Sequence, residues 1–160
     1  MSITPTLRKI EGFRVVGYSV RTSNPEEAAG AGRIADLWRR FSGSVHELGD
    51  GPPVAVYDSY ESDHLGKYTI TVGSLATDDA RIPDGGSATE VESGDYLVYP
   101  VPAGEMPHTL IATWQQVWGD FTAPDFPYRR TFVCDFEVHT PEGDLELTTE
   151  LFIGVERVAR

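Results

Sequence analysis

The sequence predicts an α+β fold, in which duplicated strand-helix-strand-strand units form an antiparallel sheet with two main helices and pseudo-twofold symmetry. Three observations lead to this prediction. Two segments have the apolar spacing of a helix, six others are rich in β-branched and aromatic residues, and the order of these elements repeats once. A helix with one apolar stripe must bury it, and a sheet is a natural partner. The 160 residues suffice for one core. We therefore predict a single domain over 1–160, with internal repeats at about 10–80 and 90–157.

The first predicted helix begins at Asn24 and ends near Gly43. Asn24 can cap the helix, and Pro25 suits its first turn. Gly30 and Gly32 each weaken the first half by about 1 kcal/mol relative to alanine, so the pattern allows a break there. The apolar residues are spaced i, i+3, i+4 and i+7 along one face, and they are Ile34, Leu37, Trp38 and Phe41.

The second predicted helix runs from about Pro107 to Trp118, and Gly119 is expected to end it. Its apolar stripe contains Leu110, Ile111, Trp114, Val117 and Trp118. Short clusters of Gly, Asp and Pro separate the remaining segments, which read as strands. The predicted strands are 13–21, 54–60, 68–76, 95–102, 130–139 and 145–156.

The two halves of the chain align weakly with each other. Val72-Gly73 corresponds to Ile153-Gly154 at an offset of 81, and Trp38 corresponds to Trp114 at an offset of 76. The shared order of these matches favours an internal duplication. We expect a pocket at the seam between the two units, where pockets tend to form. A third match aligns Val56-Tyr57-Asp58 with Val133-Cys134-Asp135 at an offset of 77.

The charge balance limits the partners of the protein. There are 13 basic and 25 acidic residues, which give a net charge of −12, and no more than two basic residues are adjacent. Nucleic acids and anionic membranes are therefore not expected as partners, whereas a cationic or amphipathic organic ligand would be attracted. The single cysteine, Cys134, excludes an internal disulfide. The histidines are scattered, and the N-terminus lacks the features of a signal peptide. We expect a cytoplasmic protein without a metal or another cofactor.

Four segments together resemble the GyrI-like family, the effector-binding domains of AraC-type and MerR-type multidrug regulators of bacteria. The resemblance implies a small-molecule-binding domain connected with transcription regulation. The regulators carry an attached DNA-binding domain, for which this sequence has no basic patch and no spare length, so a stand-alone binding protein is expected. The segments are 34–41, 56–73, 94–104 followed by Trp114 and Trp118, and 130–137 followed by 149–155.

Glu150 is the first candidate for a functional residue. The resemblance implies that a glutamate at this place in the last strand is the acidic group at the floor of the pocket. A poorly solvated carboxylate among aromatic rings favours an organic cation. Strand alternation alone favours a solvated glutamate, because a glutamate on a polar face of a strand usually lies in solvent. The candidate ligand-binding aromatics are Phe152, which shares the face of Glu150, and Trp38, Trp114, Tyr57, Tyr68 and Tyr96.

Glu137 is assigned a structural or solvated role, because alternation groups it with Asp135 and His139 and separates it from Phe132 and Phe136. The leading hypothesis is thus a binding protein for amphipathic, cationic small molecules with Glu150 in its pocket. One alternative is an enzyme, since some GyrI-like proteins resemble hydrolases of cyclopropane-containing electrophiles, and Glu150 would then be the general base. The other is an acidic protein-interaction or inhibitor module with a protein partner.

Overall fold

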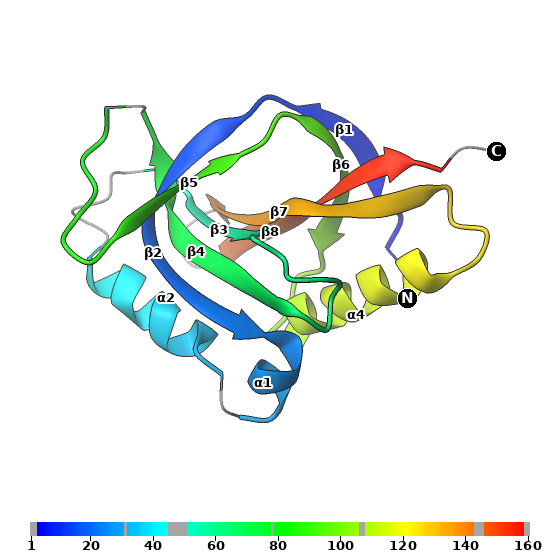
Figure 1. Ribbon diagram of the computed structural model, residues 1–160, viewed down its shortest axis with the longest axis horizontal. Coiled ribbons are helices and arrows are strands. Elements are labelled where there is room, and N and C mark those ends of the chain that lie inside the picture. Colours follow the sequence, from blue (N-terminus) through cyan, green and yellow to red (C-terminus); the bar gives the residue numbers. More distant parts are fainter. Residues whose placement is uncertain are drawn as a thin grey trace.

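Eight antiparallel strands form one sheet, and α1, α2 and α4 accompany it (Figure 1). The computed structural model describes residues 3–30, 32–44, 51–77, 79–105, 108–142 and 146–158. The α+β class and the antiparallel sheet that the sequence predicts are therefore confirmed. The strands are β1 (Thr6–Ile10), β2 (Phe13–Ser23), β3 (Pro53–Asp58), β4 (Lys67–Ala76), β5 (Ser87–Val91), β6 (Gly94–Val101), β7 (Tyr128–Glu142) and β8 (Glu146–Arg157). The helices are α1 (Asn24–Ala28), α2 (Ile34–Gly43) and α4 (His108–Thr122).

The strand order is β1-β6-β8-β7-β3-β4-β2-β5. This order is symmetric about its centre, because each strand of the first half and its counterpart in the second half lie equally far from the midpoint of the sheet. The sequence did not predict β1 and β5. Each of these strands pairs with a strand of the other half of the chain, β1 with β6 and β5 with β2. Both are short edge strands, and four of the five residues of β1 are exposed, so they lack the apolar alternation of a half-buried strand.

Apolar side chains cover both faces of the sheet. On the face toward the helices, residues of β2, β3 and β4 pack against α2, and residues of β6 and β8 pack against α4. On the other face, Phe136 of β7 stacks on Phe152 of β8 with ring centroids 4.4 Å apart, and valines of β2, β3 and β6 surround them. The sheet curls, and its edge strands bend away from the helices (Figure 1). Residues that alternate along the central strands are consequently buried on either side.

The first predicted helix is two helices. α1 ends before Gly30, which takes a positive φ of 84°, and α2 begins at Ile34. The break falls where the glycines weakened the helical pattern. The cap of α1 is Ser23, whose hydroxyl accepts a hydrogen bond from Glu26 N, and not Asn24 as the sequence suggested. The side-chain amide of Asn24 does not cap α1 and instead makes hydrogen bonds at the cavity described below.

The second helix, α4, continues past Gly119 to Thr122. Nothing lies within 4 Å of a Cβ built on Gly119, so an alanine fits there. Because glycine costs a helix interior about 0.5–1 kcal/mol relative to alanine, we expect Gly119→Ala to raise the free energy of unfolding by about that amount. Urea denaturation measures the change, and an unchanged or lower midpoint would show that the helix is frayed at this turn.

The register of β3 on β7 corrects one of the proposed alignments between the halves. Tyr57 faces the helices together with Ala55, whereas Cys134 lies in the core on the other face of the sheet. Residues that point to opposite faces cannot be equivalent, so the offset of 77 is wrong. The sheet pairs Val56 with Phe136, which lie on the same face. Tyr57 and Glu137 both lie on the face toward the helices.

Candidate functional site

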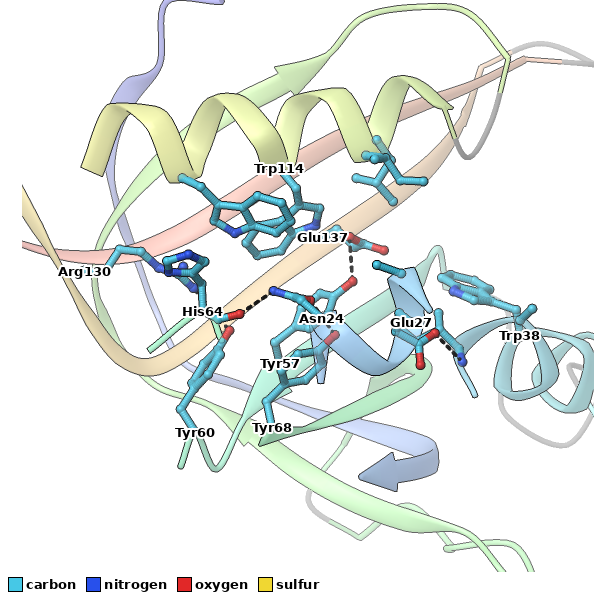
Figure 2. A pocket seen from close by; sticks show the side chains of 16 residues that line it. Asn24, Glu27, Trp38, Tyr57, Tyr60, His64, Tyr68, Trp114, Arg130 and Glu137 are labelled. Atoms are coloured by element: carbon cyan, nitrogen blue, oxygen red, sulfur yellow. Dashed lines mark hydrogen bonds between the residues drawn. The ribbon is translucent and has the colours of Figure 1, made fainter. Parts of the chain in front are cut away.

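A cavity of about 480 Å³ lies between the helix-facing side of the sheet and the three helices. Its size is typical of pockets for drug-sized molecules. Figure 2 shows Trp38 and Glu27 at one end, Arg130 and His64 at the other, and Glu137 between them. The aliphatic part of the wall comes from α1, α2 and α4 and consists of Ala28, Ile34, Ala35, Leu110 and Ile111.

Aromatic rings form much of the wall. Alternation along β3 points Tyr57 toward the helices, and its ring lies 5.5 Å from Tyr68 of β4 and 5.3 Å from Trp114 of α4, edge to face in both cases. Trp114 and Trp118 follow each other at i and i+4 on α4, with ring centroids 6.4 Å apart. Tyr60 lies 5.9 Å from Tyr68. These contacts between neighbouring rings hold them in place around the cavity.

Glu137 of β7 is a carboxylate in the wall of the cavity, and its residue is only 1% exposed. The hydroxyl of Tyr57 donates a hydrogen bond to Glu137 Oε2 at 3.2 Å. Nε2 of His139 lies 3.2 Å from Glu137 Oε1. Burial, reinforced by the charge of Glu137, raises the pKa of Tyr57 well above its ordinary value. Tyr57 therefore remains a protonated donor toward the carboxylate.

Glu27, the second carboxylate of the cavity, already has partners. It accepts hydrogen bonds from the backbone N–H groups of Arg33 and Ile34, at 2.7 and 3.1 Å, and from the hydroxyl of Thr22 at 2.6 Å. The two N–H groups belong to the start of α2, where the helix dipole favours a negative charge. Glu27 thus caps α2, and the helix dipole offsets part of its charge.

Arg130 has a dedicated partner as well. Its Nη2 donates to Asp135 Oδ2 at 2.6 Å, and both side chains are almost fully buried. The hydroxyl of Tyr60 donates to the same oxygen at 2.5 Å, while Asp135 Oδ1 accepts the N–H of Gly154 at 2.9 Å. Burial alone would lower the pKa of Arg130, but the charge of Asp135 outweighs it and raises the pKa. The pair therefore adds no net charge to the cavity.

One end of the cavity is closed by the loop between β3 and β4. Asn24 donates its side-chain N–H to the carbonyl of His64 at 2.7 Å and accepts the hydroxyl of Tyr68 at 2.9 Å (Figure 2). The imidazole of His64 stacks on the indole of Trp118, with centroids 5.8 Å apart. The start of α1, the loop and α4 are thereby joined around the cavity.

The structure brings four of the seven predicted site residues to this cavity, namely Trp38, Trp114, Tyr57 and Tyr68. It places the other three elsewhere. Glu150 is 3.7 Å from Arg8 in an ion pair, and its side chain is 41% exposed. Phe152 and Tyr96 belong to the core on the opposite face of the sheet. The position expected for Glu150, at the floor of a pocket, is therefore not the one it takes.

Glu137 lines the cavity although the sequence does not predict it there. The alternation was read correctly, since Asp135, Glu137 and His139 do share one face of β7. All three are buried, so Glu137 is not solvated, and it lines the cavity. Alternation of ionisable with apolar residues is also the pattern of an antiparallel strand with one solvated face, so no signal in the sequence distinguished the buried face of β7 from a solvated one.

Within the described ranges, no group of three or more His, Cys, Asp or Glu side chains is arranged to hold a metal ion. None of the helices in this part of the chain is long and apolar enough to span a membrane.

Comparisons with known proteins agree with this architecture. An integron cassette protein from the mobile metagenome of Vibrio cholerae is 30% identical, with a TM-score of 0.80 and 95% of each chain covered. SAV2435, solved with bound tetraphenylphosphonium, is 19% identical, with a TM-score of 0.73 and coverage of 96% of this chain and 94% of that one. YobU of Bacillus subtilis (strain 168) is 29% identical over 132 residues, which make up 79% of this chain and 80% of that protein.

The family described as "Cass2: Integron-associated effector binding protein" matches residues 6–155. This match agrees with the resemblance to effector-binding domains that the sequence shows. The chain belongs to the Cass2 family of integron-associated effector binding proteins.

Proposed function

We propose that the protein binds a lipophilic organic cation in the cavity, with Glu137 as its counter-charge. The observation that carries this proposal is a carboxylate, in a residue that is 1% exposed, in a wall of aromatic rings. A carboxylate removed from water is stabilised by an opposite charge. Aromatic faces add about 0.5–2 kcal/mol per contact with a cation.

The charges around the cavity support the same ligand class. Arg130 is neutralised by Asp135, and the start of α2 offsets only part of the charge of Glu27, so Glu137 and Glu27 leave the interior with a net negative charge. The net charge of −12 also raises the local concentration of cations. Tetraphenylphosphonium, the compound bound to SAV2435, is a bulky aromatic cation of this class and is a suitable probe.

The test compares Glu137→Gln with Glu150→Gln. Binding of tetraphenylphosphonium is followed by quenching of the tryptophan fluorescence, because Trp38, Trp114 and Trp118 line the cavity. We expect Glu137→Gln to weaken binding tenfold or more, which corresponds to about 1.4 kcal/mol or more. Glu150→Gln, at the partly exposed ion pair with Arg8, should leave the affinity within about twofold.

The neutral compound triphenylphosphine oxide serves as the charge control. Its affinity should change little in Glu137→Gln, because the variant keeps the shape of the cavity and removes only the charge. Equal weakening of the neutral and the cationic probe would contradict the role of Glu137 as a counter-charge. A loss of cation binding in Glu150→Gln alone would show that Glu150 is the counter-charge, as the sequence predicts.

A hydrolase of cyclopropane-containing electrophiles is the second candidate function, and one contact favours it. The Tyr57 hydroxyl and the Glu137 carboxylate are 3.2 Å apart in an apolar cavity, so a proton donor and a base lie side by side. Glu137 would replace Glu150 as the general base. This candidate is tested by chromatography of such a compound after incubation with the protein or with Glu137→Gln. Consumption of the compound that stops in the variant supports catalysis, and an unchanged compound contradicts it.

A further inference from the structure

His139 lies behind Glu137 and does not line the cavity. It follows Glu137 by two positions on β7, so both side chains point toward the helices. The two residues are 5% and 1% exposed. Nε2 of His139 is 3.2 Å from Glu137 Oε1, and its ring is nearly perpendicular to that of Trp38, with centroids 5.0 Å apart. The imidazole is thus held between the carboxylate and an aromatic residue of the cavity wall.

The second ring nitrogen of His139 has a partner that suits both charge states of the imidazole. Its Nδ1 is 3.0 Å from Oγ1 of Thr149, a residue of β8 that is 4% exposed and directly paired with His139 in the sheet. A hydroxyl group can donate to a neutral imidazole or accept from a protonated one. His139 can therefore gain a proton without leaving a buried N–H unpaired, and Nε2–H faces Glu137 in either state.

The other charged groups near this pair have hydrogen-bond or ion-pair partners of their own or lie apart from it. Glu27 caps α2, and Arg130 is paired with Asp135. On α2, which packs against His139 through Trp38, Asp36 and Arg39 form an exposed pair, and Arg40 lies over Tyr18. His64 stacks on Trp118 at the far end of the cavity. Among the described residues, His139 is the only basic group within ion-pair distance of Glu137.

We propose that His139 sets the charge of the ligand site: a neutral His139 leaves Glu137 free to attract a cation, and a protonated His139 neutralises Glu137 and releases that cation. The proposal rests on the proposed function. Histidine is the side chain that ordinarily changes charge between about pH 5 and 8. Binding of the proton and of the cation compete, so each weakens the other by the same factor. Affinity for a cation should therefore fall as the pH falls.

Tetraphenylphosphonium is the probe, since its charge does not change with pH. We expect its dissociation constant to rise about tenfold or more between about pH 8 and pH 5.5 in the unmodified protein. In His139→Gln the affinity at about pH 8 should stay within about threefold, and the dependence on pH should be largely lost. The matched control is His64→Gln, which removes the histidine that lines the cavity and should keep the dependence.

Thr149→Val provides a second variant in case His139→Gln does not fold. It removes the partner of Nδ1 in both charge states, and because an unpaired N–H of a charged imidazole costs more than an unpaired nitrogen of a neutral one, the loss of affinity should move to lower pH. Calorimetry in phosphate and in bis-Tris, which differ in ionisation enthalpy, should show proton release upon binding in the unmodified protein between about pH 6 and 7, where both compounds buffer.

Binding that does not depend on pH, or a dependence that disappears in His64→Gln and persists in His139→Gln, would overturn the role of His139 and leave the proposed function intact. Absence of binding at about pH 8 would overturn both.

Discussion

Replacing Asp135 with asparagine is expected to lower the free energy of unfolding by about 3–5 kcal/mol, the range found when one partner of a buried ion pair is removed. The carboxylate is fully buried and accepts hydrogen bonds from Arg130, Tyr60 and the N–H of Gly154. Asparagine has one acceptor oxygen in place of two, and it leaves the charge of Arg130 without a counter-charge in the interior. Urea denaturation followed by circular dichroism measures the loss.

The exposed pair between Arg129 and Glu156 is the matched control. Its atoms are 2.6 Å apart, as in the buried pair, but the two side chains are 67% and 51% exposed. Glu156→Gln should therefore change the stability by less than about 1 kcal/mol. Similar losses in the two variants would contradict the assignment of the large effect to burial. The comparison separates burial from distance, since the distance is the same.

Gly73→Ala is the second substitution with a large expected effect. Gly73 of β4 pairs with Gly17 of β2, and a Cβ on Gly73 would lie 2.9 Å from the Cα of Gly17 and closer still to the carbonyl oxygen of Val16. These are backbone atoms, which cannot rotate away as a side chain can, so the two strands would have to separate. We expect a loss of about 3 kcal/mol, at the upper end of the usual cost of overpacking.

Gly119→Ala makes the same chemical change in open space, where it is expected to stabilise the protein. The two substitutions should therefore shift the urea midpoint in opposite directions. If Gly73→Ala shifts it by no more than Gly119→Ala does, β2 and β4 are not as closely packed as the structure shows. Crystals or amide exchange of Gly73→Ala should show the disturbance concentrated along these two strands.

The sequence predicts the central part of the fold well, because burial imposes periodicity on it. The six strands at the centre and the apolar faces of α2 and α4 follow from the spacing of residues such as Leu37 and Val117, which are indeed buried. The edge strands escape prediction because β1, with residues such as Arg8 and Lys9, is held by backbone pairing with β6 and not by an apolar face. Backbone pairing leaves little trace in the amino-acid sequence.

The candidate site is predicted in part for a related reason. Trp38 and Trp114 reach the cavity because helices with one apolar stripe must turn it toward the sheet. Alternation separates the faces of a strand, but it does not tell which polar face is buried. Glu137 and Glu150 both stand on polar faces in the sequence. Only the packing of α2 and α4 over β7 decides that Glu137 is enclosed while Glu150 meets Arg8 near the surface.

The exchange of β1 and β5 between the halves bears on how the protein is made. A nascent chain released by the ribosome as far as Ala76 carries β2, β3 and β4, but β2 still lacks β5, β3 still lacks β7, and β1 has no partner until β6 emerges. Open strand edges invite pairing with other chains. Synthesis that stalls before Ser87 would thus leave a fragment prone to aggregation, because the open strand edges of the first half are paired only after the second half has been synthesised.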